Sequence, residues 1–353
     1  MDFTYKFPAV KGCQARKEYY IAMVPLKYLI KIFGRDEEYL PPEHRAQRKI
    51  NEMRIPEIKK YILDNRENYV FSALSASIDG EFHFESASGQ NIGLLEIDMN
   101  SKFLINDGQH RKAAIEAAMS EDESLEDETI SIVFFKDNGL ARSQQMFTDL
   151  NKHAVKTSNS LSTLYDTRDE VAVATKDVID SIQFFKRFTD KERDILGKNS
   201  SNLFTLNMIY KANQKILRGS CTDKDRKFIK NYWQCVSDNI AEWQDVMTKE
   251  ITKKDLRENY IITLAITLAS LGRLGRFFYD NPKVKMDKYL KNLKNIDWSR
   301  TNTDWLGRTI RSNGKVLTSE EAIALTCIKI KQLIGLELTD EEKQKENQFM
   351  EKR

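Results

Sequence analysis

The sequence predicts an α+β protein, with a mixed N-terminal domain, residues 1–165, followed by an all-α C-terminal domain, residues 166–353. Short runs of β-branched and aromatic residues, bounded by turn residues, are confined to the first of these ranges. Beyond it they give way to amphipathic segments with the period of a helix. A length of 353 residues also suits two domains of ordinary size.

The first elements follow from strand-forming residues and from prolines. Residues 19–33 are predicted to form a strand that breaks at Pro25 and enters a short helix. Residues 38–50 are predicted to be a loop with a basic cluster. Pro56 suits the first turn of the helix that comes next.

Two β-hairpins are expected after that helix. Within residues 69–86 the dipeptide Asp79-Gly80 is a strong signal for a two-residue turn, and residues 93–107 contain an Asn-Ser turn. The remaining N-terminal elements are a helix over 111–119, a buried strand over 129–135 and a helix over 139–153.

The C-terminal domain is predicted to consist of amphipathic helices. The last of them is announced by Thr318 and by Glu321 three positions later, which is the spacing of a capping box. The predicted helical segments are 207–217, 226–247, 256–280, 285–296 and 319–335.

The composition limits the class of protein and its compartment. Lysine and arginine number 56 against 53 acidic residues, so an anionic partner is permitted but not demanded. The N-terminus has no apolar signal core, and the longest apolar segment, residues 260–272, is too short to span a bilayer. We therefore expect a cytoplasmic protein that does not enter the membrane.

The four cysteines fit a reducing compartment better than a disulfide scaffold. They lack the paired spacing of a structural zinc site, so no metal site is expected. Cys13 lies among basic residues and is either a small buried residue, the commoner case, or a thiol that senses redox state.

The segment FLINDGQHRKAAIEAA, residues 103–118, places a polar corner between a strand-like run and a helix-like run. A helix that begins near Gln109 leaves its first N–H groups without intrahelical partners, and its dipole adds positive potential there. Gly108 lacks a β-carbon, so a ligand can approach the backbone, while His110 and Arg111 add donors. Together these groups predict a site for a phosphate or another anion.

Asp107 has two interpretations. It can orient Arg111, hold a metal ion that accompanies a phosphate, or polarise a water molecule. Alternatively it is an ordinary N-cap residue in a common Asp-Gly turn, and Arg111 is a surface side chain.

A resemblance to known proteins favours the functional interpretation. NDGQHR between a strand and an alanine-rich helix is similar to the defining motif of the DGQHR-domain proteins, which look like distant relatives of the ParB/sulfiredoxin fold. Three further segments resemble the DndB family of regulators, which are encoded with the bacterial DNA phosphorothioate-modification (Dnd) system. These segments are FPAVKGCQARKEYYIAMVP (7–25), MFTDLNKHAVKTSNSLSTLYDTRDEVA (146–172) and IDWSRTNTDWLGRTI (296–310).

The resemblance implies roles for individual residues. In ParB relatives the matching corner grips a nucleoside triphosphate through backbone N–H groups and arginine, a role that falls here on Gly108, Gln109, His110 and Arg111. The sulfiredoxin branch has a reactive cysteine where this chain has Gln109, which excludes thiol chemistry at the corner. A related DGQQR corner is associated with nucleotide hydrolysis, although His110 departs from that pattern.

A second candidate lies at the end of the helix over 139–153. Asn151 and Lys152 would come near the corner in such a fold, where Lys152 would meet a phosphate as a point charge. The alternative is that Asn151 only ends the helix, because asparagine tolerates left-handed geometry.

Basic groups that suit DNA phosphates occur in both predicted domains. Those with the strongest patterns are Arg45, Arg48, Lys49, Arg273, Arg276, Lys285, Lys288 and Lys291. Lysines from 285 onward recur every third residue, which more often marks a solvated helix face. Glycines beside Arg273 and Arg276 would allow close approach of DNA.

The sequence leaves three functions open. The leading one, which the resemblance implies, is a transcriptional repressor that binds double-stranded DNA at the promoter of its own phosphorothioation gene cluster and is tuned by a nucleotide. The second is an NTP-hydrolysing or DNA-nicking enzyme that acts through Asp107 and Arg111. The third is a scaffold for other Dnd proteins. Any cofactor would be ATP or another nucleoside triphosphate with Mg²⁺, and a homo-oligomer stays open.

Overall fold

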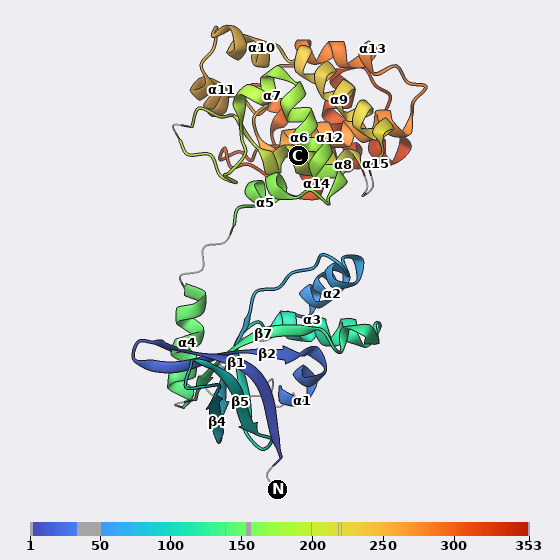
Figure 1. Ribbon diagram of the computed structural model, residues 1–353. Helices are drawn as coiled ribbons and strands as arrows, with labels where there is room; N and C mark the ends of the chain where they lie inside the picture. Colours follow the sequence, from blue (N-terminus) through green and yellow to red (C-terminus); the bar gives the residue numbers. More distant parts are fainter. Residues whose placement is uncertain are drawn as a thin grey trace. The chain divides into compact units, whose positions relative to one another are not determined.

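A computed structural model describes residues 3–33, 51–137, 139–152, 157–198, 200–217, 219 and 221–351. The chain divides into two compact units, Met1–Val155 and Lys156–Arg353 (Figure 1). The first contains a mixed sheet and the second is mostly helical, which confirms the α+β prediction.

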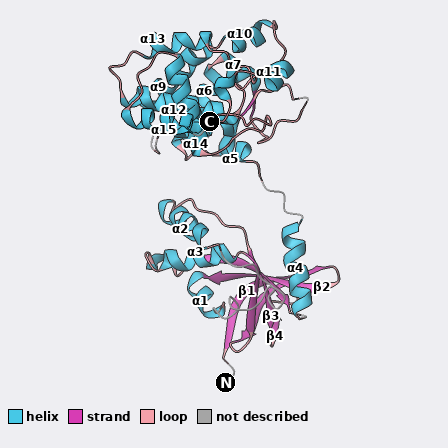
Figure 2. Cartoon of the chain, turned by 180° about the vertical axis from the view of Figure 1, so that it is seen from behind, coloured by secondary structure: helices cyan, strands magenta, loops and turns pink. Residues whose placement is uncertain are grey.

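The first unit is built on a seven-stranded sheet with the order β4-β5-β1-β2-β7-β3-β6. The strands of this sheet are magenta in Figure 2. All neighbouring pairs are antiparallel except β3 and β7, which are parallel. The strands are β1 (Thr4–Gln14), β2 (Lys17–Pro25), β3 (Leu74–Asp79), β4 (Phe82–Ser86), β5 (Ile92–Asp98), β6 (Lys102–Asp107) and β7 (Thr129–Lys136).

Both hairpins predicted from local turns are wrong, although the strands themselves exist. β3 does not pair with β4 across Gly80, because β3 lies between β7 and β6 while β4 pairs with β5. Likewise β5 and β6 lie at different places in the sheet. A turn signal fixes a change of direction, whereas strand pairing is decided by which faces can be buried together.

Helices cover the two faces of the sheet unequally. The predicted short helix after Pro25 and the helix at Pro56 are confirmed as α1 (Leu29–Ile32) and α2 (Ile55–Asp64), and α3 is Gln109–Met119. Ile62 of α2 and Ile115 of α3 share one core with Ala76 of β3. α4 (Leu140–Lys152) lies against the opposite face, where its Met146 meets β6.

The β1–β2 hairpin extends beyond its neighbours, at the left of the sheet in Figure 1. β1 pairs with β5 only over Thr4–Val10, and β2 pairs with β7 only over Tyr19–Pro25. Residues 11–18 therefore form a two-stranded ribbon, and none of the described strands pairs with it on either side. Cys13 lies on this ribbon and is exposed, so the expectation of a buried thiol is wrong.

The second unit is an assembly of helices with one short parallel pair, β8 (Thr189–Asp190) and β9 (Phe204–Thr205). Two of the long predicted helices are each divided, into α9 and α10 and into α11 and α12. The helices are α5 (Asn159–Tyr165), α6 (Glu170–Ser181), α7 (Gln183–Phe188), α8 (Leu206–Ile216), α9 (Asp223–Asp238), α10 (Ala241–Thr248), α11 (Lys253–Asn259), α12 (Ala265–Asp280), α13 (Met286–Leu290), α14 (Glu320–Leu333) and α15 (Asp340–Glu351).

Close packing of α12 on α8 and α9 explains Gly272 and Gly275. A β-carbon at Gly272 would lie 2.3 Å from the carbonyl oxygen of Ala212. One at Gly275 would lie 2.9 Å from the ring of Tyr232. Both glycines are buried, so they serve contact between helices and do not open the backbone to DNA.

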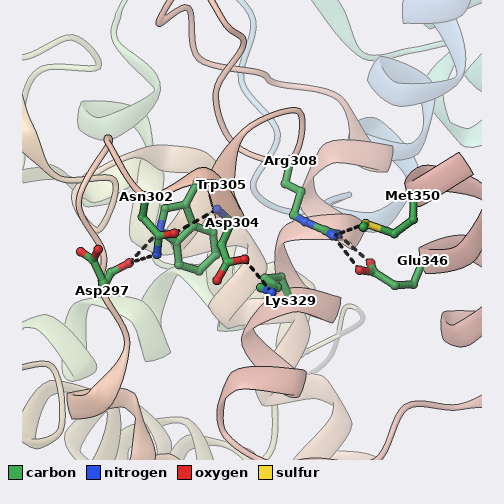
Figure 3. A network of polar contacts seen from close by, with 8 residues as sticks. All are labelled: Asp297, Asn302, Asp304, Trp305, Arg308, Lys329, Glu346 and Met350. Carbon is green, nitrogen blue, oxygen red and sulfur yellow. Dashed lines mark hydrogen bonds and ion pairs between the residues drawn. The ribbon is translucent and has the colours of Figure 1, made fainter. Parts of the chain in front are cut away.

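The segment 296–310 is a structural element of the second unit, shown in Figure 3. The rings of Trp298 and Trp305 stack with centroids 5.3 Å apart, and Trp305 Nε1 donates to the carbonyl oxygen of Asp297 at 2.8 Å. Arg308, which is 2% exposed, donates from both terminal nitrogens to the Glu346 carboxylate at 2.6 Å. The motif thus attaches α15 to the rest of the unit.

The start of the last predicted helix is displaced by one residue. Ser319, not Thr318, is the N-cap of α14, because its side chain accepts from the N–H of Ala322. The sequence interpretation also missed α15. Its residues DEEKQKENQFME carry few apolar side chains, so helical periodicity gives little signal there.

We predict that the Arg308–Glu346 pair stabilises the second unit strongly. Glu346→Leu leaves a buried guanidinium without its partner and should lower the free energy of unfolding by about 3–5 kcal/mol. The double change Arg308→Met with Glu346→Leu should recover most of that loss. Tryptophan fluorescence in urea measures this unit alone, because all four tryptophans lie in it.

Glu341→Leu on the same helix is the control, because Glu341 pairs with Lys345 at an exposed site and should change stability little. A Glu346→Leu protein as stable as the Glu341→Leu protein would contradict the prediction.

Candidate phosphate-binding corner and basic surfaces

The polar corner lies where the sequence predicts it, between β6 and α3. β6 ends at Asp107, and Gly108 turns the chain with φ of 106° before α3 begins at Gln109. The N–H of Lys112 donates to the carbonyl oxygen of Gly108 at 2.9 Å, which is the first helical hydrogen bond. Gly108 is the N-cap and has no side chain to bond the next N–H groups, so no side chain caps the helix from that position.

Gly108 is required for two reasons. Its backbone is left-handed, which glycine adopts without steric cost. A β-carbon there would also lie 2.3 Å from Cδ2 of Leu74 and 3.3 Å from Nη2 of Arg111. The space beside the α-carbon of Gly108 is therefore filled by these two side chains, so the glycine serves the packing of the corner.

The guanidinium of Arg111 is held by the segment that leads into β3. Nη1 donates to the carbonyl oxygen and the hydroxyl of Ser72, both at 2.6 Å, and to the carbonyl oxygen of Ala73 at 3.1 Å. Nη2 donates to Oδ2 of Asp107 at 2.7 Å. The Arg111 side chain is 17% exposed and that of Asp107 is 46% exposed, so the pair opens to solvent on its carboxylate side.

His110 connects the corner to α2. Its Nε2 accepts a hydrogen bond from the backbone N–H of Asn51 at 2.9 Å, so this nitrogen carries no proton in that contact. Asn51 precedes the short turn that leads into α2. The candidate DNA-binding residues Arg45, Arg48 and Lys49 come just before Asn51 in the chain and lie outside the described residues.

A row of buried polar groups beneath α4 was missed by the sequence interpretation. Asn106, the first residue of NDGQHR, is 1% exposed. Its Nδ2 donates to Oγ of Ser77 at 2.9 Å and contacts Sδ of Met146 at 3.2 Å. Oδ1 of Asn106 and Oγ of Ser75 find no hydrogen-bond partner within the described part of the chain. The alternation of Ser75 and Ser77 with apolar residues in β3 is the signal that could have indicated this polar face.

The second candidate for a phosphate contact stays a prediction. Asn151 and Lys152 are the last residues of α4, but their side chains lie outside the described part of the structure. α4 does lie against β6, as the contact between Met146 and Asn106 shows.

A hollow of about 610 Å³ lies on the same unit, between the β1–β2 ribbon, the end of β7 and α4. It does not include the DGQHR corner. Its walls carry cations, carboxylates and aromatic rings. The lining residues are Gln14, Ala15, Lys17, Glu18, Tyr20, Phe82, Phe135, Lys136, Arg142, Met146, Asp149 and Leu150.

The predicted lysine stripe is exposed on the second unit. The helix expected over 285–296 is divided into α13 and a 3₁₀ turn, Lys291–Asn295. Lys285, Lys288 and Lys291 are all exposed. The acidic residue among them, Asp287, accepts from Sγ of Cys235 at 3.5 Å. Burial, with this hydrogen bond as the second cause, raises the pKa of Cys235 to about 12.

The two arginines on α12 differ in their contacts. Arg273 is exposed. Arg276 is engaged by its own unit, because Nη2 lies 2.6 Å from Oδ1 of Asp280 and Nη1 donates to the carbonyl oxygen of Ile216 at 3.1 Å. Its guanidinium also lies 5.0 Å from the centre of the Tyr279 ring. Arg273 is therefore the better placed of the two for an external anion.

Among the residues that the structure describes, no three His, Cys, Asp or Glu side chains are grouped so that they could hold a metal ion. None of the described helices has both the length and the apolar character that crossing a bilayer requires.

The fold defines the class of protein: an α+β unit joined to a helical unit that carries exposed basic side chains. Comparison with family models identifies the family: the chain belongs to the DndB family, described as DNA-sulfur modification-associated, whose model matches residues 7–337. The matched range contains both the DGQHR corner and the segment 296–310. No curated protein and no solved structure matches the chain. The likeness to the ParB/sulfiredoxin fold stays a prediction.

We predict that Gly108→Ala lowers the stability of the first unit. A left-handed backbone alone costs a residue with a β-carbon about 1–3 kcal/mol, and the loss here should be larger. The added methyl group must also displace Leu74. Because the first unit contains no tryptophan, hydrogen exchange followed by mass spectrometry on β3 and α3 peptides is the suitable measurement.

Gly89→Ala separates the two costs. Gly89 has φ of 73°, but a β-carbon there would meet nothing within 4 Å. Equal losses of protection in the two variants would show that the contact with Leu74 does not matter.

Proposed function

We propose that the protein is a DNA-binding transcriptional regulator that represses a phosphorothioate-modification gene cluster, with the duplex promoter DNA of that cluster as its partner. Membership of the DndB family over residues 7–337 is the observation that carries this proposal. The exposed lysine stripe gives it a physical basis, since phosphate contacts by lysine supply affinity for any DNA sequence.

The stripe suits this role because its cations are not neutralised. Lys285, Lys288 and Lys291 form no ion pair with any described residue, and Asp287 between them is turned toward Cys235. Binding of DNA phosphates to these lysines would release counterions from the duplex, which is favourable at low salt. Arg273 on α12 adds an exposed cation to the same unit.

A nucleotide at the DGQHR corner is the proposed regulator of DNA affinity. The N-terminus of α3 carries the positive end of the helix dipole, and its N-cap, Gly108, has no side chain that could cap it. This end of the helix therefore attracts a phosphate group. Ser72 and Ala73 hold the Arg111 guanidinium in place, so a phosphate can replace Asp107 as the acceptor of Nη2 without moving the arginine. Asn151 and Lys152 are proposed as further phosphate contacts from α4.

Hydrolysis of the nucleotide is a second candidate function, and the half-exposed carboxylate of Asp107 beside Arg111 is the observation that favours it. In that case Asp107 would orient water or a metal ion bound to the phosphates. The two roles of Asp107 have different measurable effects. A carboxylate that competes with the phosphate for Arg111 weakens nucleotide binding, whereas a catalytic carboxylate accelerates phosphate release.

We predict that Lys285→Ala, Lys288→Ala and Lys291→Ala together weaken DNA binding without changing promoter preference. The slope of log K against log salt should become shallower by about 0.9 for each lost phosphate contact. Fluorescence anisotropy with promoter and random duplexes at several KCl concentrations measures both quantities.

The control removes three lysines that already have acidic partners, Lys27, Lys343 and Lys345. It lowers the net charge equally and should leave the salt slope nearly unchanged. Equal slopes in the two triple variants would remove the stripe from the interface. Wild-type protein that binds promoter no better than random DNA would remove the repressor proposal itself.

We also predict that Asp107→Asn tightens ATP binding about threefold to fivefold, because a carboxylate that competes for Arg111 is neutralised. Arg111→Ala should weaken it. Calorimetry measures affinity, and phosphate release measured on the same samples tests hydrolysis. Asp127→Asn, at an exposed carboxylate paired with Lys27, is the matched control. Loss of phosphate release with unchanged ATP affinity in Asp107→Asn would favour the enzyme over the regulator.

A further inference from the structure

The ribbon formed by residues 11–18 is braced on both of its faces where it leaves the sheet. On one face the Tyr19 ring lies across Gly12, where a β-carbon would come within 2.4 Å of the ring, and it packs beside Phe135 with centroids 6.0 Å apart. On the other face Lys11 forms an ion pair with Glu18 at 3.1 Å, and the Tyr20 hydroxyl donates to the same carboxylate at 2.8 Å. The ribbon is therefore a stiff projection with a fixed direction.

The tip of the ribbon has an unusual turn. Gln14 pairs with Lys17, so Ala15 and Arg16 form a two-residue loop, and their φ angles are 51° and 61°. Such a turn ordinarily contains Asn-Gly, because both central residues must be left-handed. Placing two residues with β-carbons there costs conformational energy, which is expected where a side chain is needed for function. Arg16 is the side chain that this turn presents to solvent.

The tip of the ribbon carries cationic side chains that no described acidic residue neutralises. Glu18 is occupied by Lys11 and Tyr20, whereas Arg16 and Lys17 form no ion pair with any residue that the structure describes. Residues 13–18 are all exposed. Gln14 and Lys17 face the same side of the ribbon because they are directly opposite in the pairing register. Both line the 610 Å³ hollow, and Arg142 of α4 lines it too.

We propose that this ribbon enters the major groove of duplex DNA, that Gln14 and Arg16 contact base edges there, and that Lys17 and Arg142 contact the phosphates of the strand beside it. The inference rests on the proposed DNA-binding function and assigns sequence recognition to a specific part of the chain. The hollow between the ribbon and α4 is lined by three cationic residues, Lys17, Lys136 and Arg142, and by two acidic ones, Glu18 and Asp149. The cations outnumber the acids where the phosphates of that strand would lie.

The dimensions of the ribbon fit this partner. The major groove is about 12 Å wide and about 8.5 Å deep and admits a two-stranded ribbon. Residues 11–14 at about 3.3 Å each give the ribbon a reach of about 13 Å, more than the depth of the groove. Arginine pairs with guanine and glutamine with adenine through the atoms that the major groove exposes. Both residue types are present at the tip.

The test replaces the turn without weakening it. Ala15→Asn with Arg16→Gly installs the favoured turn sequence and removes the arginine, and Ala15→Asn alone is the matched control that keeps it. Anisotropy with the full chain gives affinities for promoter duplex, random duplex and single-stranded DNA. We expect the ratio of promoter affinity to random-duplex affinity to fall about tenfold in the double variant. The control should keep the wild-type ratio.

A second measurement locates the groove. Dimethyl sulfate methylates guanine N7 in the major groove, and wild-type protein and the Ala15→Asn control should protect promoter guanines that the double variant leaves reactive. An unchanged affinity ratio with unchanged N7 protection in the double variant would overturn the assignment of the ribbon. Tighter binding of wild-type protein to single-stranded than to duplex DNA would overturn the groove proposal.

Failure of the inference differs from failure of the proposed function. If the wild-type protein and the double variant prefer the promoter equally, only the assignment of recognition to the ribbon is contradicted. If the wild-type protein does not prefer the promoter, the proposed repressor function is contradicted.

Discussion

The contact of Arg111 with the segment before β3 is the constraint on which the first unit depends. β3 lies parallel to β7 and is separated from it in sequence by β4, β5, β6 and α3, so no short turn fixes its place. Beside the pairing with β6 and β7, Arg111 holds the entry to β3, because one guanidinium bonds the carbonyl oxygens of Ser72 and Ala73 and the carboxylate of Asp107. The end of β6, the start of α3 and the entry to β3 are thereby held at one point.

This constraint changes the meaning of the DGQHR motif. Gly108 and Arg111 are needed for the fold whether or not a ligand binds, since Leu74 and the guanidinium fill the space that a β-carbon would take. A phosphate at the corner would find an arginine that is already oriented, and only the bond to Asp107 would have to be exchanged. Such an exchange costs little reorganisation, because the acceptors at Ser72 and Ala73 remain in place. A structural arginine is in this sense a suitable anion contact.

Sequence patterns predicted those parts of the fold that local chemistry determines. Pro25 and Pro56 fix φ, and the corner at Gly108 needs a left-handed residue, so these features could be found from the sequence. Strand partners could not, because the Asp79-Gly80 turn changes the direction of the chain without choosing a neighbour for β3. The contacts of Arg111 and the burial of Asn106 depend on segments more than 25 residues away. Helix α15 was missed because one buried ion pair, Arg308 with Glu346, replaces much of the apolar face that a pattern would detect.

The two kinds of basic group on this chain suit different physical tasks. Exposed lysines such as Lys285, Lys288 and Lys291 are point charges on long side chains, and attraction of such charges to phosphates is nearly independent of sequence. An arginine on the turn of a braced ribbon starts from a defined backbone position, and its guanidinium can pair with guanine through two hydrogen bonds. In the proposed recognition, bracing by Tyr19 and Tyr20 would add to the effect of charge, because a flexible ribbon would lose more conformational entropy on binding. In the proposed regulator, affinity and specificity would arise from different surfaces, and a nucleotide that altered only one of them would change repression without abolishing DNA binding.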